Sequence, residues 1–497
     1  MEITWLDRAV KKTDLFIRNR PKEVRKSYGQ FFTGQQTARF MASLLEIPKQ
    51  GPITILDPGS GTGILSAALL EQIENCGFKG EVELTCYETD ELVLPVLEEN
   101  LQMIQSEASF SLRFTILNRN YILEQADSFE GTLLDSLQQE SKKYNLAIVN
   151  PPYRKIAKDD PQALAVPSIC KGAPNLYFIF TAIALFNLEP DGQMSVIIPR
   201  SWTSGLYFRS FRNYLVHSGS VEHLHLFVSR SKVFDKDSVL QETIIVKLRK
   251  AKQAPKITMT TTESNADFDT LTTFQASCNT VIFGPDNYFY LVTNPKEAEI
   301  LHKLSQFKQT LPDIGLKMKT GLTVDFRVRE DLRNNANENT VPLFYSHHLK
   351  DGRVEHPIGK EGEWLETGKK GLLQPNTNYL FVKRFTAKEE KRRLQSSVYL
   401  ADSFPDYEFI STQNKINFIT GNKPLDKKTV FGLYVLFNST LYDQYYRILN
   451  GSTQVNSTEI NNMPVPSLET IRHLGARLIT KNDLSESSCN QILEEIL

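Results

Sequence analysis

Cysteine is scarce in this chain of 497 residues, which contains only Cys76, Cys86, Cys170, Cys278 and Cys489. The five are scattered and odd in number, and none occurs in the C-x-x-C spacing of many metal and redox sites. Their distribution argues against a disulfide framework and against a structural zinc site. We therefore expect a protein of a reducing compartment, without a metal centre.

Long apolar runs are also absent from the sequence. No uninterrupted apolar stretch approaches the ~18–20 residues of a membrane span. The first residues lack the basic head and long apolar core of a secretory signal. The sequence therefore predicts a cytoplasmic protein without a membrane anchor, and its length predicts two or three domains.

The chain has almost no net charge, but its charges are segregated by sign. The net charge is −1. Residues 1–50 carry ten Lys/Arg against five Asp/Glu, residues 51–150 carry five against sixteen, and residues 301–400 carry eighteen against twelve. A polyanion is drawn to the basic flanks and avoids the acidic middle. Chance variation among solvated helix faces can give a similar pattern, so charge alone does not identify the partner.

The most informative stretch is an apolar strand, expected over 144–149, that ends in Asn150, Pro151, Pro152 and Tyr153. The prolines lack N–H donors and restrict the turn, so the Asn150 amide oxygen and a neighbouring carbonyl can converge on one spot. Two such acceptors suit an –NH2 group on a planar ring, and Tyr153 offers an aromatic face for stacking. The same residue types are common in turns without chemistry. The glycine-rich turn upstream favours the functional interpretation.

That glycine-rich turn follows a strand expected over 53–56 and precedes a helix expected over 64–73. Glycine permits a sharp turn and a close approach of the backbone to a ligand. The spacing is neither that of a phosphate-binding P-loop nor the G-x-G-x-x-G of dinucleotide-binding folds. The residues of the turn are Asp57, Pro58, Gly59, Ser60, Gly61, Thr62 and Gly63.

Two further strand ends carry residues that could contact the ligand bound at the glycine-rich turn. Glu88 and Thr89 follow a strand expected over 83–87, and Glu88 lies about where doubly wound folds place an acid for ribose hydroxyls. A strand-end acid can instead cap the next helix. Asn120 and Tyr121 follow a strand expected over 114–117. In this class of fold that strand end usually meets an adenine ring, so Asn120 could hydrogen-bond the ring edge and Tyr121 or Ile122 could pack on its face.

The N-terminal region predicts a basic helix over 1–28 and a second helix from Gln35. Thr33 is placed to cap the second helix. The free N–H groups at its start, beside a glycine loop, form a natural seat for a carboxylate.

Strands alternate with helices from 53 to 248, which predicts an α/β fold with a mainly parallel sheet and ligands at its carboxyl edge. We expect this domain to cover 1–250. His223 and His225 lie on one side of a strand, and without a third ligand we interpret them as surface or core histidines. The remaining helices are expected over 175–188 and 208–216. The remaining strands are expected over 195–199, 221–227 and 238–248, and the last of them is expected to close the sheet. A linker is expected over 251–256.

Residues 257–497 form the second expected domain, of mixed α+β class. Alternation stops there, and short strands are interspersed with aromatic residues and with basic clusters such as Lys383-Arg384 and Lys391-Arg392-Arg393. This mixture suits a phosphate backbone and base edges. One strong helix is expected over 429–449.

These residues resemble the S-adenosylmethionine-dependent DNA adenine-N6 methyltransferases in which the cofactor half precedes the target-recognition half. Gly29-Gln30-Phe31-Phe32-Thr33 resembles the family's N-terminal cofactor motif, Asp57 to Gly63 its glycine loop, and Asn150 to Tyr153 its catalytic motif. The order of the motifs resembles the TaqI-like group. The length and the Lys-Ser-Tyr-Gly-Gln-Phe-Phe-Thr opening are similar to the PstI/BsuBI modification enzymes.

The resemblance implies a Rossmann-like class I methyltransferase domain that binds S-adenosylmethionine, followed by a target-recognition domain. It implies that Phe32 and Thr33 contact the cofactor, that Glu88 holds its ribose, and that Phe234 packs on a flipped base. Asn120 stands where the family usually has an aspartate that accepts from the adenine amine, and Asn can still accept through its oxygen.

The expected reaction is site-specific methyl transfer from S-adenosylmethionine to N6 of a flipped-out adenine in double-stranded DNA, without a metal or a covalent enzyme intermediate. The expected partner is a separately encoded restriction endonuclease that acts on the same site. The protein is expected to be a monomer associated with the nucleoid. Methylation of RNA adenine, cytosine N4 or protein glutamine, and a non-catalytic DNA-binding subunit, remain as alternatives.

Overall fold

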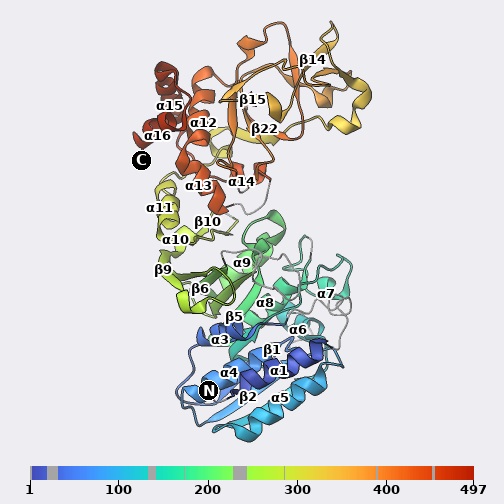
Figure 1. Ribbon diagram of the computed structural model, residues 1–497, viewed down its shortest axis with the longest axis vertical. Helices are drawn as coiled ribbons and strands as arrows, with labels where there is room; N and C mark the ends of the chain where they lie inside the picture. Colours follow the sequence, from blue (N-terminus) through green and yellow to red (C-terminus); the bar gives the residue numbers. More distant parts are fainter. Residues whose placement is uncertain are drawn as a thin grey trace. The chain divides into compact units, whose positions relative to one another are not determined.

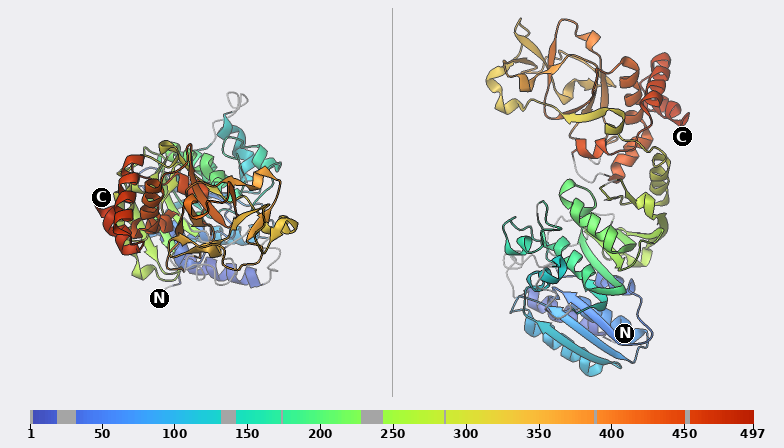
Figure 2. Two further views of the ribbon diagram at one scale, coloured as in Figure 1. Left: turned by 90° about the horizontal axis from the view of Figure 1, so that it is seen from above. Right: turned by 180° about the vertical axis from the view of Figure 1, so that it is seen from behind.

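The computed structural model describes residues 3–18, 32–131, 142–172, 174–227, 243–284, 286–387, 390–449 and 454–497. Contacts between Cα atoms divide the chain into two compact units, Met1–Pro295 and Lys296–Leu497. Each unit contains its own sheet structure (Figures 1 and 2). They are therefore described separately.

The first unit is built on one twisted sheet, in which nine strands of the described residues follow the order β3-β2-β1-β4-β5-β7-β6-β8-β9. Strands β1 to β5 pair in parallel, whereas β7 is antiparallel to both of its neighbours. The strands are β1 (Ile53–Pro58), β2 (Glu81–Tyr87), β3 (Ser111–Leu117), β4 (Tyr144–Val149), β5 (Leu188–Pro199), β6 (Ser220–Phe227), β7 (Thr243–Arg249), β8 (Lys256–Thr262) and β9 (Thr272–Ser277).

Helices cover the sheet because its central strands are apolar on both faces. Ile55 belongs to a core cluster with residues of α1, α3, α4 and α5, whereas its neighbour Leu56 is equally buried and points the other way, as alternation requires. Helix α8 contacts β1 and β5 and packs with α6 and α9. The helices of this unit are α1 (Trp5–Arg18), α3 (Gln35–Ser43), α4 (Ile64–Asn75), α5 (Leu94–Glu107), α6 (Tyr121–Glu130), α7 (Pro161–Leu164), α8 (Leu176–Phe186), α9 (Arg209–Ser218) and α10 (Cys278–Val281).

The end of this sheet differs from the expectation. Strand β7 does not close it, because β6 pairs with β8 in parallel and β8 pairs with β9. Residue 256, placed in the linker, begins β8. The first unit therefore continues to residue 295 rather than ending at 250.

The second unit combines two sheets with a group of helices (Figure 1). In the described residues, six strands follow the order β12-β22-β19-β20-β16-β15 and five follow β13-β17-β14-β21-β18. The strands are β12 (Leu316–Thr320), β13 (Leu332–Arg333), β14 (Thr340–Phe344), β15 (Leu349–Lys350), β16 (Arg353–Val354), β17 (Trp364–Glu366), β18 (Gln374–Pro375), β19 (Tyr379–Lys383), β20 (Ser396–Tyr399), β21 (Phe409–Thr412) and β22 (Ile416–Gly421). The helices after them are α12 (Lys427–Asn438), α13 (Thr440–Leu449), α14 (Ser457–Asn461), α15 (Leu468–Lys481) and α16 (Glu486–Glu494).

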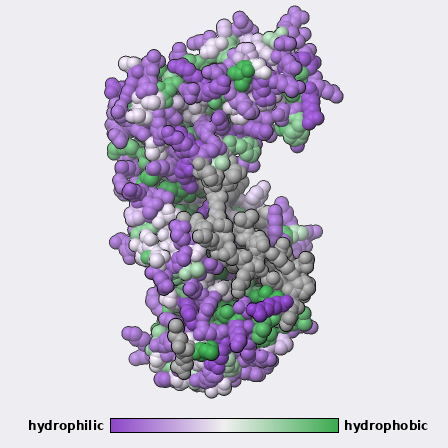
Figure 3. Space-filling view, in the orientation of Figure 1, coloured by the Kyte–Doolittle hydropathy of each residue, from purple (hydrophilic) through white to green (hydrophobic). Residues whose placement is uncertain are grey.

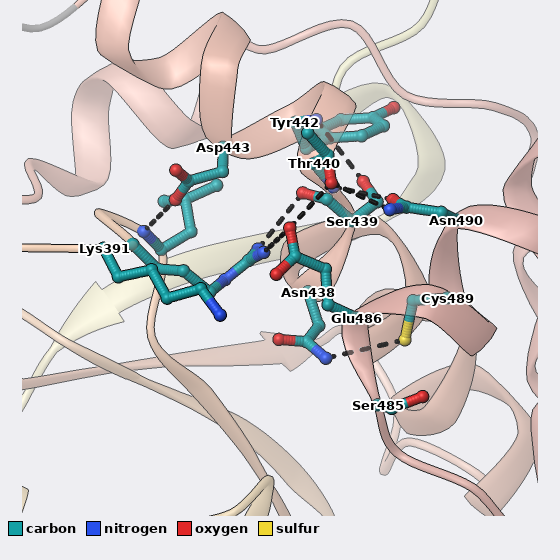
Figure 4. A network of polar contacts seen from close by, with 12 residues as sticks. Lys391, Asn438, Ser439, Thr440, Tyr442, Asp443, Ser485, Glu486, Cys489 and Asn490 are labelled. Carbon is teal, nitrogen blue, oxygen red and sulfur yellow. Dashed lines mark hydrogen bonds and ion pairs between the residues drawn. The ribbon is translucent and has the colours of Figure 1, made fainter.

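The single helix expected over 429–449 is two helices, because Ser439 between α12 and α13 adopts an extended conformation. A polar network holds this junction (Figure 4). The Arg392 guanidinium donates to the Ser439 carbonyl (3.1 Å) and pairs with Glu486 of α16 (3.0 Å). The Thr440 N–H donates to Asn490 (2.8 Å). These partners are distant in sequence, so local periodicity could not reveal the break.

Two glycines allow α12 and α15 to cross closely. A Cβ atom at Gly475 would lie 1.8 Å from the Lys428 carbonyl oxygen, and one at Gly432 would lie 1.8 Å from the Ile471 carbonyl oxygen. We expect Gly475→Ala to lower the free energy of unfolding by about 1–3 kcal/mol, because the overpacking outweighs the ~1 kcal/mol gain in helix propensity.

Chemical denaturation followed by circular dichroism measures this effect. Gly368→Ala is the matched control in the same unit, since no atom lies within 4 Å of its Cβ position. If Gly475→Ala is as stable as the control, the close crossing is not a feature of the folded protein.

The face of the second unit that is visible in Figure 3 is mostly hydrophilic. In the described parts of both units, no helix combines the length and apolar character needed to cross a bilayer.

Candidate active site

Four loops of the first unit meet at one edge of the sheet because strands β3, β2, β1 and β4 are parallel and adjacent. Pro58, Tyr87 and Leu117, the last residues of β1, β2 and β3, are in register. The loops that follow the strands therefore line up in strand order. The loop after β3 and the loop after β4 are separated by three strand spacings, a distance of about 14 Å. An elongated ligand could lie along this edge.

The glycine-rich turn after β1 is held by backbone hydrogen bonds. Gly59, Gly61 and Gly63 have φ values of 85°, 54° and 83°, a region that favours glycine. The N–H groups of Gly59 and Ser60 both donate to the Tyr87 carbonyl, at 2.8 and 2.9 Å. The turn is thereby fastened to the end of β2, and Gly63 leads directly into α4.

A cavity of about 270 Å³ opens at this edge of the sheet. It brings together most of the predicted site residues: Phe32, Thr33, Gly59, Ser60, Gly61, Glu88, Thr89, Asn120, Tyr121, Asn150, Pro151 and Pro152. The other lining residues are Thr62, Ile64, Leu65, Tyr87, Arg119, Arg154, Gln162, Leu176 and Phe180. The turn that begins at Asn150 and the glycine turn therefore share one cavity.

Asn150 is connected to the N-terminal motif across the cavity. Its Nδ2 donates to the Thr33 hydroxyl at 2.9 Å, although the two residues are 117 positions apart. Thr33 does not cap the helix as expected. The N-cap of α3 is Gly34, which makes no side-chain capping bond. The Thr33 side chain is directed instead to the predicted catalytic amide.

Four predicted residues do not line the cavity: Asp57, Pro58, Gly63 and Tyr153. Tyr153 is buried, and its hydroxyl donates to the Ile197 carbonyl at 3.0 Å. This hydrogen bond fixes the position of the ring, and its stacking on a base stays a prediction. Phe234 lies outside the described residues, as do the residues Gly29, Gln30 and Phe31 of the N-terminal motif.

Asp57 is buried beneath the glycine turn. It accepts a hydrogen bond from the Ser66 hydroxyl at 2.6 Å. Burial raises the pKa of Asp57 to about 7, against the effect of that hydrogen bond. Its position indicates that it orders the turn and the start of α4 from below.

Glu88 is the acidic group of the cavity wall. Its carboxylate accepts the N–H groups of Gly61 (2.9 Å), Thr89 (2.8 Å) and Asp90 (2.8 Å). Burial raises its pKa, while these N–H donors act in the opposite direction. A fixed, buried carboxylate next to a glycine turn suits the hydroxyl groups of a ribose.

Aromatic residues and amides form the wall after β3. Tyr121 is buried, with its ring centroid 4.9 Å from that of Tyr87 and 5.4 Å from that of Phe180. Asn120 caps α6 by accepting the Leu123 N–H at 3.1 Å. Together with Glu88, this wall fits an adenosyl group: a carboxylate for the ribose and apolar rings with amides for the base.

Three polar residues of the cavity wall were not predicted from the sequence: Arg119, Arg154 and Gln162. The first two adjoin Asn120 and Tyr153 in the chain, and this adjacency could have identified them. Gln162 belongs to α7, a helix of four residues within a polar connection, and carries no sequence signal.

The histidines 223 and 225 are held inside the first unit. Both rings bond the Thr260 hydroxyl, at 2.7 and 2.9 Å. Burial lowers the pKa of His223 to about 4 and that of His225 to about 3, so both are neutral at pH 7. Their interpretation as packed side chains agrees with these contacts.

One group in the described residues has the composition of a metal site. His348, His356 and Glu363 of the second unit offer ligand atoms that lie within 4.8 Å of one another. His348 Nδ1, however, accepts the Tyr345 N–H at 2.8 Å, so in the neutral ring Nε2 carries the hydrogen and donates to Glu363 (3.1 Å). This hydrogen-bonded state opposes metal binding through Nε2.

The sheet order, the glycine turn after β1 and the acid after β2 define a class I S-adenosylmethionine-dependent methyltransferase domain. The family model described as Eco57I restriction-modification methylase matches residues 70–234.

Two relatives that match this chain over nearly their whole length are type II methyltransferases. The chain is 33% identical to type II methyltransferase M.PstI of Providencia stuartii over 95% of this chain and 94% of the relative. It is also 33% identical to type II methyltransferase M.BsuBI of Bacillus subtilis, over 94% of each. The structure of the type IIL restriction-modification enzyme MmeI in complex with DNA has a similar fold, with a TM-score of 0.52 at 11% identity, covering 99% of this chain and 73% of that one. The chain therefore belongs to the type II DNA methyltransferases of restriction-modification systems, and its cofactor is S-adenosylmethionine.

Proposed function

We propose that the chain methylates N6 of an adenine that is flipped out of double-stranded DNA. The observation that carries this proposal is that Asn150, Pro151 and Pro152 line the same cavity as Gly59 and Gly61. An amine acceptor and the cofactor-binding turn thus face one volume. When bound, S-adenosylmethionine supplies a methyl group on a positively charged sulfur.

Asn150 would bind and orient the target amine. Its Oδ1 would accept one amine hydrogen and a carbonyl of the proline turn the other, which favours a pyramidal nitrogen with its lone pair directed at the methyl carbon. The contact from Asn150 Nδ2 to Thr33 holds the amide in place. Catalysis by this arrangement is positioning and hydrogen-bond polarisation.

Arg154 follows the catalytic turn and gives the cavity rim a positive charge. Its carbonyl accepts the Leu176 N–H at 3.0 Å, and the Ile156 N–H donates to the Pro174 carbonyl at 3.1 Å. The backbone of this segment is thereby fixed beside the cavity, and the exposed Arg154 and Lys155 side chains suit phosphates that flank a flipped nucleotide.

We assign target recognition to the second unit, Lys296–Leu497, which lies within the range 257–497 expected from the sequence. Two exposed aromatic rings carry neighbouring guanidinium groups: Arg327 lies 5.7 Å from the Phe326 ring centroid and Arg384 lies 5.5 Å from that of Phe385. Such pairs offer both charge for phosphates and flat surfaces for bases.

Not every basic cluster of the second unit can serve this purpose. Arg393 is fully buried, with its Nε donating to the Thr386 hydroxyl at 3.2 Å, and Arg392 is engaged in the junction of Figure 4. Of the cluster Lys391-Arg392-Arg393, only Lys391 is exposed.

The test is a labelled-methyl assay of the purified full chain with duplex DNA, RNA and a release-factor-type protein. We expect label in DNA alone, and sequencing of DNA from expressing cells should place N6-methyladenine in one sequence context. Label at cytosine N4, in RNA or in protein would contradict the proposal, and binding without transfer would indicate a non-catalytic subunit.

We further propose that the protein acts as a monomer in the cytoplasm, in association with the nucleoid. A separately encoded endonuclease would cleave the unmodified form of the same site. The relatives' membership of restriction-modification systems supports the last statement.

A further inference from the structure

Gln162 lies at the end of the cavity opposite the catalytic turn. It belongs to the connection between β4 and α8, which starts beside Asn150 and reaches back to the residues after β3. Two contacts show this path: Asn120 Nδ2 donates to Gln162 Oε1 at 3.1 Å, and the Ser168 hydroxyl donates to Glu130 of α6 at 2.7 Å.

The orientation of the Asn120 amide is determined by the helix that it caps. Its Oδ1 accepts the Leu123 N–H, and only the oxygen of an amide can accept. Nδ2 is therefore the atom directed at Gln162. Amide orientations are otherwise ambiguous, but here the start of α6 settles it.

The orientation of Gln162 follows from that of Asn120. Facing a donor, Gln162 must present Oε1, while its Nε2 lies 3.4 Å from Asp160 Oδ1. An –NH2 group has two hydrogens and an amide oxygen has two lone pairs. The cavity wall thus carries a donor and an acceptor side by side, each able to make one further bond.

We propose that this amide pair selects the 6-aminopurine of the cofactor, with Gln162 Oε1 accepting from the amine and Asn120 Nδ2 donating to ring nitrogen N1. A 6-oxopurine presents the opposite polarity at both atoms. An aspartate in place of Asn120 could only accept, whereas Asn120 donates here and Gln162 supplies the acceptor. The inference depends on S-adenosylmethionine as the cofactor and is independent of which base is methylated.

Calorimetry on the full chain, without DNA, tests the proposal with S-adenosyl-L-homocysteine and S-inosyl-L-homocysteine. We expect the adenosyl compound to bind about 10–100-fold more tightly, as for one well-placed bidentate contact. In Gln162→Leu the ratio should fall below about threefold, mainly through weaker adenosyl binding. Gln162→Glu keeps an acceptor oxygen and should retain a clear adenosyl preference.

Gln102→Leu is the matched control, because Gln102 is exposed on α5, away from the cavity. If Gln162→Leu does not show the native circular dichroism spectrum, Gln162→Asn replaces it in the test. This variant withdraws the amide by one methylene, and we expect the same loss of preference for the adenosyl compound. An unchanged ratio in either variant, or equal binding of both compounds by the unsubstituted protein, would overturn the proposal. Failure of the DNA assay alone would leave these ratios intact.

Discussion

Asn150→Ala should abolish methyl transfer to DNA while leaving cofactor affinity within about twofold. The side chain lines the cavity at the end of β4, whereas the groups proposed to bind the adenosyl moiety lie on the loops after β1, β2 and β3 and, with Gln162, on α7. Removing one preorganised hydrogen-bond group from a reacting centre costs about 10²–10³ in rate. Loss of the Thr33 contact also removes the support of the turn, so we expect a rate loss of at least about 10³, the upper end of that range.

Two measurements separate this effect from unfolding. Single-turnover rates with saturating cofactor report the chemical step, and calorimetry reports binding of S-adenosyl-L-homocysteine. Asn75→Ala is the control, since Asn75 is exposed at the end of α4. Full activity of Asn150→Ala would end the proposed mechanism, and loss of cofactor binding would show that Asn150 belongs to the cofactor site.

Glu88→Gln should weaken cofactor binding by about 10–100-fold, because hydrogen bonds to a charged group contribute about 1.5–3 kcal/mol. The substitution preserves shape but removes the charge and one acceptor. The carboxylate also receives three backbone N–H groups, so the Gly61 end of the glycine turn loses order in the variant. Both effects act on affinity, which calorimetry measures directly.

Glu91→Gln provides the matched control, because Glu91 is exposed three positions further on and outside the cavity. The elevated pKa of Glu88 adds a pH signature. Affinity of the unsubstituted protein should fall as acid protonates this carboxylate, and in Glu88→Gln that dependence should be absent. An affinity of Glu88→Gln equal to that of the control would contradict a ribose contact.

The parallel sheet and its ligand edge could be predicted because apolar strands, glycines and prolines carry strong local signals. The end of the domain could not. The alternation of strands and helices stops before β8 and β9, and only the pairing of β8 with β6 and of β9 with β8 shows that they extend the first sheet. The break at Ser439 likewise depends on Arg392 and Asn490, which are remote in sequence.

The motif residues of the candidate site were predictable as a set, but the direction of each side chain was not. Asp57 and Tyr153 belong to the two motifs and yet do not line the cavity, because Asp57 accepts from the Ser66 hydroxyl and Tyr153 donates to the Ile197 carbonyl. Gln162 was not predictable, since a polar residue in an irregular connection has no periodicity. Its place in the cavity wall depends on a contact with Asn120, which is 42 positions away in the sequence.

The N-cap of α6 has a consequence for how this protein can change. One amide both starts a helix and sets the polarity of the neighbouring glutamine. A substitution that discards the cap loses about 1 kcal/mol of stability and at the same time lets the ligand-facing groups rotate. A substitution of Asn120 that relaxes the proposed nucleoside selectivity is therefore also expected to destabilise the fold, so selection for folding helps to preserve the donor half of the amide pair.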